Sequence, residues 1–128
     1  MAPRLARLQD EFARQVARLS PTAAAVESPF HGPSAHSALQ LAQARGVILA
    51  VLAAAGVAVA EYTPTAVKKS VTGNGRASKE QVRSMVCHLL GLQDSGQSHD
   101  ISDAIAVALC HLTTARFRAA VEQAEKNR

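Results

Sequence analysis

The amino-acid sequence predicts an α/β protein, and three observations support that fold class. Apolar residues make up 48% of the 128 residues, which suits one folded domain with one hydrophobic core. Two short runs, residues 22–26 and 57–61, are apolar almost throughout, as in the buried strands of a parallel sheet. Segments with helical spacing of apolar residues precede, separate and follow these runs. Two strands are too few for an ordinary sheet, so this pattern predicts that part of the sheet is missing.

The first half of the chain is predicted to form two helices and both strands. Apolar residues recur every three or four positions over residues 4–19, and a Ser-Pro pair ends that helix. After the first strand, Ser34 can cap a helix that runs to about residue 55. The most apolar run, residues 46–60, falls short of a membrane-spanning helix and is broken by Gly56. We therefore predict a buried helix followed by a buried strand.

The second half is predicted to form three helices. Thr63-Pro64 has the form of a helix start, with Thr at the cap and Pro in the first turn, and Gly73 ends that helix. Residues 78–81 have the Ser-x-x-Gln form of a capping box and open the next helix. The last helix starts within residues 98–111, SHDISDAIAVALCH, and runs into a basic segment.

Charge and cysteine content limit the partners and the compartment. The formal net charge of +4 and the pI near 9.6 mildly favour an anionic partner such as nucleic acid. Two cysteines without the spacing of a disulfide framework indicate a reducing compartment, and the N-terminal residues lack the apolar core of a signal peptide. We predict a cytoplasmic protein without a membrane segment, with one domain over residues 1–114 and a basic C-terminal tail over residues 115–128.

Three carboxylates are the candidate catalytic residues. Asp100 and Asp103 are spaced i, i+3, so they share one face at the start of the last helix. Glu27 follows the first strand at its carboxyl end, where open α/β sheets place their chemistry. Together the three would suit a hard cation such as Mg²⁺, which prefers oxygen ligands and binds phosphates. The alternative is structural: a cap and a first-turn charge that stabilise a helix, and a solvated strand end.

Basic residues gather around the Gly-Asn-Gly loop at residues 73–75. A phosphate could bind at the helix start that follows Ser78, next to Lys79. The alternative is an ordinary solvated face, because Gly-Asn-Gly is too short for a nucleotide-binding motif. The basic residues near this loop are Lys68, Lys69, Arg76, Lys79 and Arg83.

Two Cys-His pairs, Cys87-His88 and Cys110-His111, look like a zinc motif. Adjacent residues of a helix point to different faces, and both cysteines fit apolar core positions, so we predict no zinc site. His99 adjoins Asp100, and we interpret it as a surface histidine at a helix start rather than as an accessory acid or a metal ligand.

Four segments carry a resemblance to a known family. They are Val-Glu at 26–27, Ala-Arg-Gly at 44–46, residues 67–75, and Asp-x-x-Asp-Ala at 100–104. Together they are highly specific, and over roughly residues 3–114 the chain resembles the RuvC family of bacterial Holliday-junction resolvases.

This resemblance implies a ribonuclease-H-like mixed sheet with flanking helices and a homodimeric enzyme. Members of the family nick two strands of like polarity at a four-way DNA junction during recombination and DNA repair. They use Mg²⁺ or Mn²⁺, two ions per active site, and act with a branch-migration motor.

The resemblance also implies catalytic roles for individual residues. Glu27 matches the strand-end glutamate of the family, and Asp100 and Asp103 match its C-terminal aspartate pair, so these three would be metal ligands. Lys79, with Lys68, would neutralise charge that develops on the phosphate.

Further residues would serve DNA binding and dimerisation. Phe30 matches an aromatic residue that stacks near the junction centre, and the helix over residues 34–55 matches the one that builds the dimer interface. The implied DNA-binding residues are Phe30, Lys68, Lys69, Arg76 and Lys79.

One departure from the family pattern is serious. The family opens with a strand carrying Gly-Ile-Asp-Pro-Gly, whose aspartate is the central metal ligand, and this sequence has no such motif. We expect the chain to begin at the family's first helix and to lack the N-terminal strands, which would expose an edge of the strand at residues 22–26. We therefore predict weak metal binding and little or no cleavage. The alternatives are an inactive junction-binding protein and a metal-dependent phosphotransfer enzyme acting on another nucleic acid.

Overall fold

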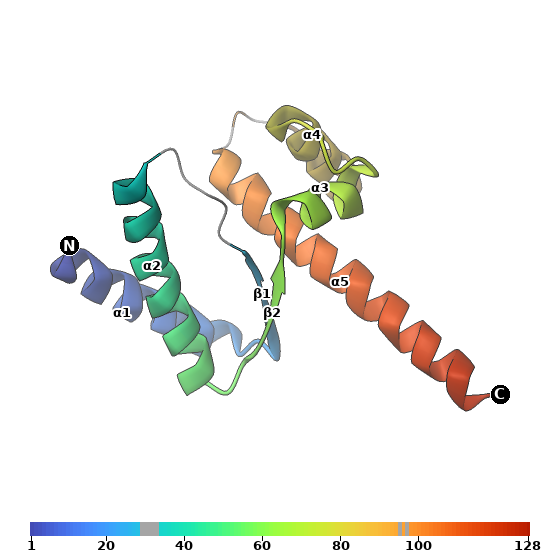
Figure 1. The fold of residues 1–128 in the computed structure, drawn as a ribbon, viewed down its shortest axis with the longest axis horizontal. Coiled ribbons are helices and arrows are strands. Elements are labelled where there is room, and N and C mark those ends of the chain that lie inside the picture. Colours follow the sequence, from blue (N-terminus) through green and yellow to red (C-terminus); the bar gives the residue numbers. More distant parts are fainter. Residues whose placement is uncertain (29–33, 95, 97) are drawn as a thin grey trace. The chain divides into compact units, whose positions relative to one another are not determined.

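The computed structural model describes residues 1–28, 34–94, 96 and 98–128, and its elements follow the predicted order (Figure 1). The chain divides into two compact units, Met1–Glu61 and Tyr62–Arg128. The elements are α1 (Ala2–Leu19), β1 (Ala23–Glu27), α2 (Ala35–Ala54), β2 (Ala58–Tyr62), α3 (Pro64–Thr72), α4 (Lys79–Leu90) and α5 (His99–Lys126).

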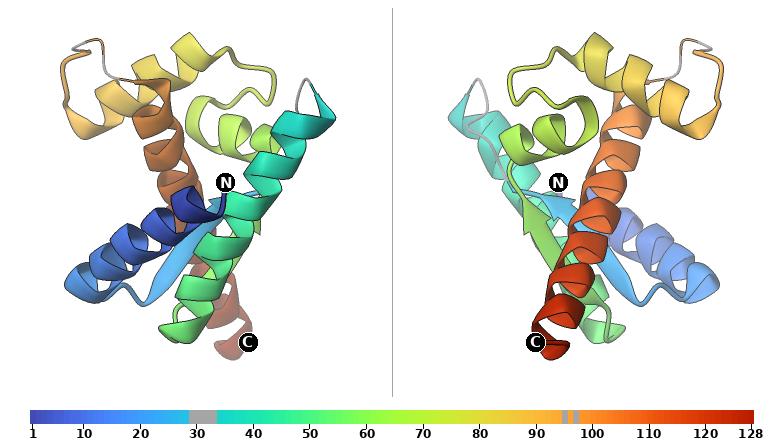
Figure 2. Two further views of the ribbon diagram at one scale, coloured as in Figure 1. Left: turned by 90° about the vertical axis from the view of Figure 1, so that its left-hand side faces the viewer. Right: turned by 90° about the vertical axis from the view of Figure 1, so that its right-hand side faces the viewer.

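The first unit is a β-α-β arrangement preceded by a helix. β1 and β2 pair in a small parallel sheet, as predicted, and α2 connects them. α1 packs against α2, and the left view of Figure 2 shows both helices on the viewer's side of the strands. The core of this unit consists of buried Val16, Val51, Leu52 and Val57, with Phe12, Ala24, Val26 and Ile48 packed against them.

The predicted burial of both strands is wrong for this structure. The central residues of β1 are half-buried and its end residues are exposed, whereas in β2 only Ala60 and Tyr62 are half-buried. Ala24 and Val26 of β1 pack against the core of this unit. Side chains along a strand point alternately to opposite faces, so this core covers one face of the sheet. Among the described residues the sheet has two strands, so each strand has one neighbour.

In the second unit, local hydrogen bonds begin and end the helices where the sequence predicted. The hydroxyl of Thr63 accepts a hydrogen bond from the backbone N–H of the third residue of α3 at 3.1 Å. Ser78 and Gln81 form the predicted capping box of α4, with hydrogen bonds of 3.1 and 2.8 Å. Gly73 and Gly91 end α3 and α4 at φ values of 79° and 65°, a conformation that glycine adopts without steric cost.

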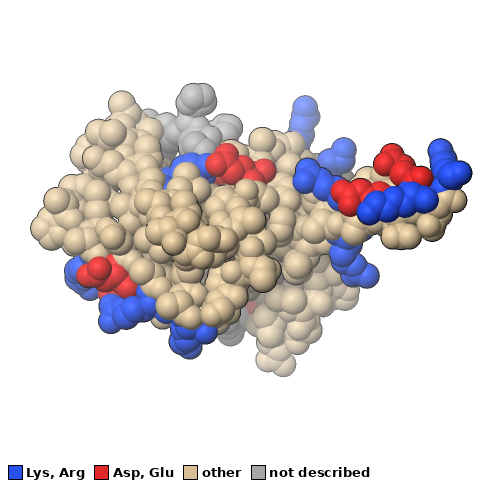
Figure 3. Space-filling model, turned by 90° about the horizontal axis from the view of Figure 1, so that it is seen from below, with Lys and Arg blue, Asp and Glu red and all other residues tan. Residues whose placement is uncertain are grey.

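α5 is 28 residues long, and both α3 and α4 pack against it. Its buried residues, Ser102, Ala106, Val107 and Cys110, all lie in its first half. Residues 115–128 are exposed, and on this projecting end Lys and Arg alternate with acidic side chains (Figure 3). The predicted basic tail therefore continues α5 as a helix to Lys126, and a single domain over residues 1–114 stays a prediction.

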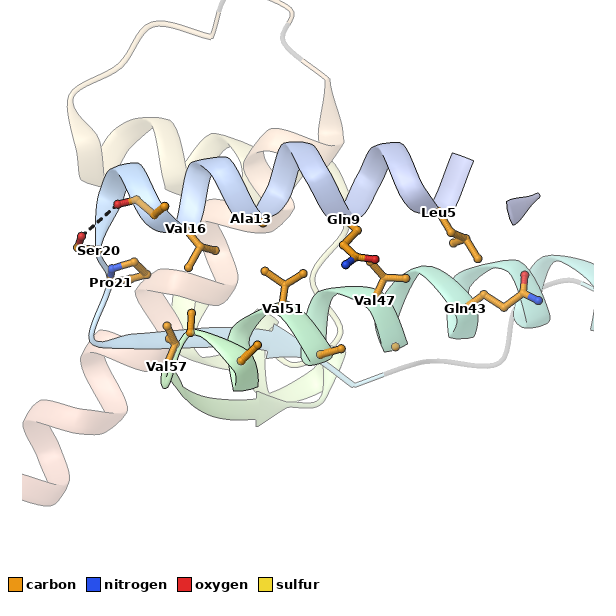
Figure 4. A pocket seen from close by; sticks show the side chains of 15 residues that line it. Leu5, Gln9, Ala13, Val16, Ser20, Pro21, Gln43, Val47, Val51 and Val57 are labelled. Carbon is orange, nitrogen blue, oxygen red and sulfur yellow. Dashed lines mark hydrogen bonds between the residues drawn. The ribbon is translucent and has the colours of Figure 1, made fainter. Parts of the chain in front are cut away.

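An apolar groove of about 980 Å³ runs between α1 and α2 in the first unit (Figure 4). Leu5 and Val16 line it from α1, and Val47 and Val51 line it from α2. Nearer the start of α2, Leu39 and Leu41 are 59% and 61% exposed. The long helix thus presents apolar surface that its own unit does not cover.

Candidate active site

The first turns of α5 carry the predicted aspartate pair. Ser98 caps this helix, because its hydroxyl accepts a hydrogen bond from the backbone N–H of Asp100 at 3.2 Å. The prediction that an aspartate caps this helix is therefore wrong. Asp100 lies in the first turn and is exposed, and Asp103 is half-buried. Their i, i+3 spacing places two carboxylates on one face at the positive end of the helix.

Glu27 is the last residue of β1, rather than the first residue after it, and it is exposed. Its backbone carbonyl accepts a hydrogen bond of 3.0 Å from Nη1 of Arg45 on α2. Nη2 of the same arginine lies 2.7 Å from Oε1 of Glu61 in β2, and the Arg45 side chain is only 18% exposed. One guanidinium therefore ties together the carboxyl ends of both parallel strands, one of which carries Glu27.

Arg45 had no predicted role. The signal that could have found it is a single cation in the middle of an Ala-rich helix, because such a side chain is rarely buried without a partner. Its partners cannot be read from the sequence, since they lie 18 and 16 positions away.

The predicted DNA-binding lysines and arginine of the second unit lie on α3, on the following loop and on α4. Lys68 is half-buried, whereas Lys69, Arg76 and Lys79 are exposed. Lys79 is the first residue of α4, next to the cap Ser78, as predicted. Within the described ranges none of these four cations takes part in an ion pair, so their charges are available to an anionic partner.

The loop that carries Arg76 is held by hydrogen bonds from its own side chains. The hydroxyl of Thr72 donates to the backbone carbonyl of Lys68 at 2.8 Å and accepts from the N–H of Asn74 at 3.1 Å. Oδ1 of Asn74 accepts from the N–H of Arg76 at 2.9 Å. The loop thus has a defined conformation that presents the Arg76 backbone next to the start of α4.

Arg83 lies near the same loop in sequence, but it has a different role from these four cations. Its Nη2 lies 2.7 Å from Oδ1 of Asp94, and its side chain is only 14% exposed. The charge of Arg83 is therefore used within the second unit, between α4 and the segment that leads to α5.

Cys110 and His111 have structural partners in the second unit. Cys110 is 2% exposed, as its predicted core position requires, and its thiol lies 3.9 Å from the backbone carbonyl of Ala66. Nδ1 of His111 is hydrogen-bonded to the hydroxyl of Tyr62 at 2.6 Å. His99 is half-buried rather than a surface residue, and its buried Nδ1 has no hydrogen-bond partner among the described residues.

The predicted metal ligands are distributed over the two units. Asp100 and Asp103 belong to the second unit and Glu27 to the first. Their carboxylate oxygens are the donors that Mg²⁺ and Mn²⁺ prefer. No group of three His, Cys, Asp or Glu side chains within the described part of the chain is placed to hold a metal ion. Joint ligation by all three carboxylates stays a prediction, and Phe30 lies outside the described residues.

A parallel sheet with flanking helices, a carboxylate at a strand end, a carboxylate pair at a helix start and exposed cations on α3 and α4 are typical of an α/β nuclease. A family model described as "Crossover junction endodeoxyribonuclease RuvC" matches residues 1–111 of the chain. The chain therefore belongs to the RuvC family, whose fold is ribonuclease-H-like and whose members are hydrolases of phosphodiester bonds. Nucleases of this family depend on metal ions.

Individual relatives agree with the family match. The crossover junction endodeoxyribonuclease RuvC of Moorella thermoacetica is 47% identical over 115 residues, covering 90% of this chain and 69% of the relative. That of Syntrophomonas wolfei is 43% identical over 122 residues, covering 95% of this chain and 71% of the relative. Among solved structures, T. thermophilus RuvC in complex with a Holliday junction substrate matches with a TM-score of 0.83 at 35% identity, covering 90% of this chain and 70% of that chain.

Proposed function

We propose that this chain recognises four-way junction DNA with the site of a structure-specific endodeoxyribonuclease of recombination and DNA repair, and that its own cleavage of the junction is weak or absent. The observation that carries the proposal is the family match over residues 1–111. The junction-bound T. thermophilus relative supports the choice of substrate, because its sequence and fold both match this chain.

The metal ligands of this function are Glu27, Asp100 and Asp103. The ions would be Mg²⁺ or Mn²⁺, two per active site, and when bound they would activate water and neutralise charge on the phosphodiester. The chain's own contribution is geometric. Ser98 caps α5 and so holds the start of the helix that carries Asp100 and Asp103. Arg45 holds the end of β1 through its hydrogen bond to the backbone carbonyl of Glu27.

The exposed cations would hold the phosphate backbone. Lys79 stands at the positive end of α4, where backbone N–H groups also favour an anion, so we assign it to the scissile phosphate, assisted by Lys68. Lys69 and Arg76 would bind flanking phosphates, and Phe30 would stack near the junction centre. Contacts to phosphates fix the position of the DNA but do not read its sequence.

A second copy of the chain would complete the enzyme as a homodimer through α2. Its support is the uncovered apolar surface of this helix, which includes Leu39 and Leu41. Replacing both leucines by Lys should convert a dimer to a monomer in sedimentation-velocity experiments. Leu112→Lys is a matched control, because Leu112 is 59% exposed but lies on α5. Dimers that persist in the double variant would contradict this interface.

The partner of the homodimer would be a branch-migration motor, and the compartment would be the cytoplasm.

Among the described residues α2 and α5 are long and apolar enough to cross a membrane by length and composition alone. Two observations favour aqueous roles for both helices: each packs against other helices of its unit, and the region matched by the nuclease family includes all of α2 and the first half of α5.

The rival function is junction binding without cleavage. It rests on the absence of Gly-Ile-Asp-Pro-Gly from the 128 residues, whose only aspartates are Asp10, Asp94, Asp100 and Asp103. The test is to incubate the chain with a labelled four-way junction and with linear duplex of the same sequence, with EDTA, Mg²⁺ or Mn²⁺. We expect preference for the junction in all three conditions and little or no nicking. Symmetrical nicks at a normal rate would overturn the expected inactivity, and equal binding to duplex would overturn junction recognition.

A further inference from the structure

Tyr62 and His111 form a side-chain contact between the end of β2 and the middle of α5. The Tyr62 hydroxyl lies 2.6 Å from Nδ1 of His111, in a partly buried setting, and the two ring centroids are 5.8 Å apart at an interplanar angle of 59°. Both residues belong to the second unit. Neither has a role in the function proposed above.

The helical positions of these residues connect them to the aspartate pair. His111 is eleven residues after Asp100 and eight after Asp103, which is about three and two turns of helix. Asp100, Asp103, Val107 and His111 therefore lie along one face of α5. Because a helix is rigid over this distance, it rotates as one body. A contact that fixes the rotation of α5 at His111 therefore also fixes the direction in which both carboxylates project.

The other buried contacts of α5 are chiefly apolar and supply no directional bond. The buried side chains of α5 and α3 are small, chiefly Ala, Val and Cys, and apolar contacts between small side chains have no directional preference. The neighbouring Cys110 thiol makes only a weak contact with the carbonyl of Ala66. Among the described residues, the Tyr62–His111 bond is the one conventional side-chain hydrogen bond that joins α5 to another element.

We propose that Tyr62 and His111 are positioning residues, whose hydrogen bond sets the rotation and register of α5 and thereby aims Asp100 and Asp103. The metal-ligand role of the aspartates rests on the proposed function, whereas the effect on the start of α5 does not. Two separate measurements therefore test the positioning role of Tyr62 and His111 and the metal-ligand role of the aspartates.

The first readout is structural and needs no metal or DNA. Tyr62→Phe removes only the hydroxyl, and His111→Leu removes the ring nitrogen that is hydrogen-bonded to it, so both should change the amide NMR chemical shifts of residues 100–104. His111→Asn keeps a polar atom near the place of Nδ1 and should restore the wild-type shifts. Val82→Ala is the matched control, because it removes a buried side chain of α4, 5% exposed, without touching the hydrogen bond.

The second readout is Mn²⁺ affinity, followed by paramagnetic line broadening. Tyr62→Phe and His111→Leu should weaken Mn²⁺ binding roughly threefold to tenfold, the fold-change that corresponds to losing one hydrogen bond. His111→Asn and Val82→Ala should bind as the wild type does. A structural role alone would make Val82→Ala behave like the other variants.

The outcomes are distinguishable. Shift changes confined to the surroundings of residues 62 and 111 would overturn the proposal even if the chain binds junctions. A wild-type chain that binds neither Mn²⁺ nor junction DNA would overturn the proposed function. The chemical shifts of residues 100–104 in the variants would still decide whether Tyr62 and His111 position α5.

Discussion

Arg83 and Asp94 form an ion pair of 2.7 Å between α4 and the segment that leads to the aspartate-bearing helix. The arginine side chain is 14% exposed and the aspartate side chain 53%. Oδ1 of Asp94 also accepts a hydrogen bond of 3.3 Å from the N–H of Gly96. One carboxylate oxygen of Asp94 therefore joins the connecting segment to α4. The same ion pair neutralises the charge of Arg83 within the protein.

Replacing Asp94 by Ala should lower the unfolding free energy by about 1–2 kcal/mol, because it leaves the mostly buried guanidinium of Arg83 without its partner. Urea unfolding followed by circular dichroism measures the change. Glu11→Ala is the control: its pair with Arg7 is 3.9 Å long and both side chains are more than 60% exposed, so the loss should stay under about 0.5 kcal/mol. Equal losses would refute a special role for the buried pair.

Gly75→Ala should destabilise the second unit by about 1–3 kcal/mol, because a Cβ at this position would lie 2.8 Å from Cγ2 of Thr65. Thr65 is β-branched and helical, so its side chain has little freedom to move away. Adding Thr65→Ser removes the clashing methyl group and should recover most of the loss in melting temperature. Gly46→Ala, in a helix with no atom within 4 Å of the new Cβ, should instead stabilise by about 0.5–1 kcal/mol.

Asp100→Asn and Asp103→Asn should each weaken Mn²⁺ binding by about tenfold or more, since each removes a proposed ligand charge. Binding to a junction in EDTA should stay the same or tighten, because one negative charge near the phosphates is lost. Asp10→Asn on α1 is the charge-matched control. Calorimetric titration of Mn²⁺ gives the first quantity and gel-shift titration the second. Unchanged Mn²⁺ affinity in both variants would remove the aspartates from the metal site.

Replacing Lys68, Lys69, Arg76 and Lys79 by Gln should reduce the steepness of the salt dependence of junction binding. Each phosphate contact contributes about 0.9 to the slope of log K against log salt, so the slope should fall by about 3 to 4. The control replaces the four arginines of α1, Arg4, Arg7, Arg14 and Arg18, and changes the net charge equally. The same decrease in both variants would mean that net charge, and not this surface, determines DNA affinity.

The element order and most helix ends were predictable because they depend on contacts within a few residues. Ser34, Thr63 and Ser78 each accept a hydrogen bond from a backbone N–H three residues later, which is why cap residues are visible in sequence. The carboxylate pair at the start of α5 was recognised for the same reason, since i, i+3 spacing is a local property. Burial of the strands was predicted wrongly, because it depends on which elements cover each face.

Local chemistry along the chain was enough to predict the order of helices and strands, their caps and the family to which the chain belongs. Only the folded chain decided which polar side chains meet: Tyr62 with His111 across 49 positions, and Arg45 with the ends of both strands. The physical reason is that caps and periodicity act over one turn of backbone, whereas such pairings depend on how whole elements pack. A sequence pattern can predict that an arginine in an apolar helix needs a partner, but tertiary packing selects the partner.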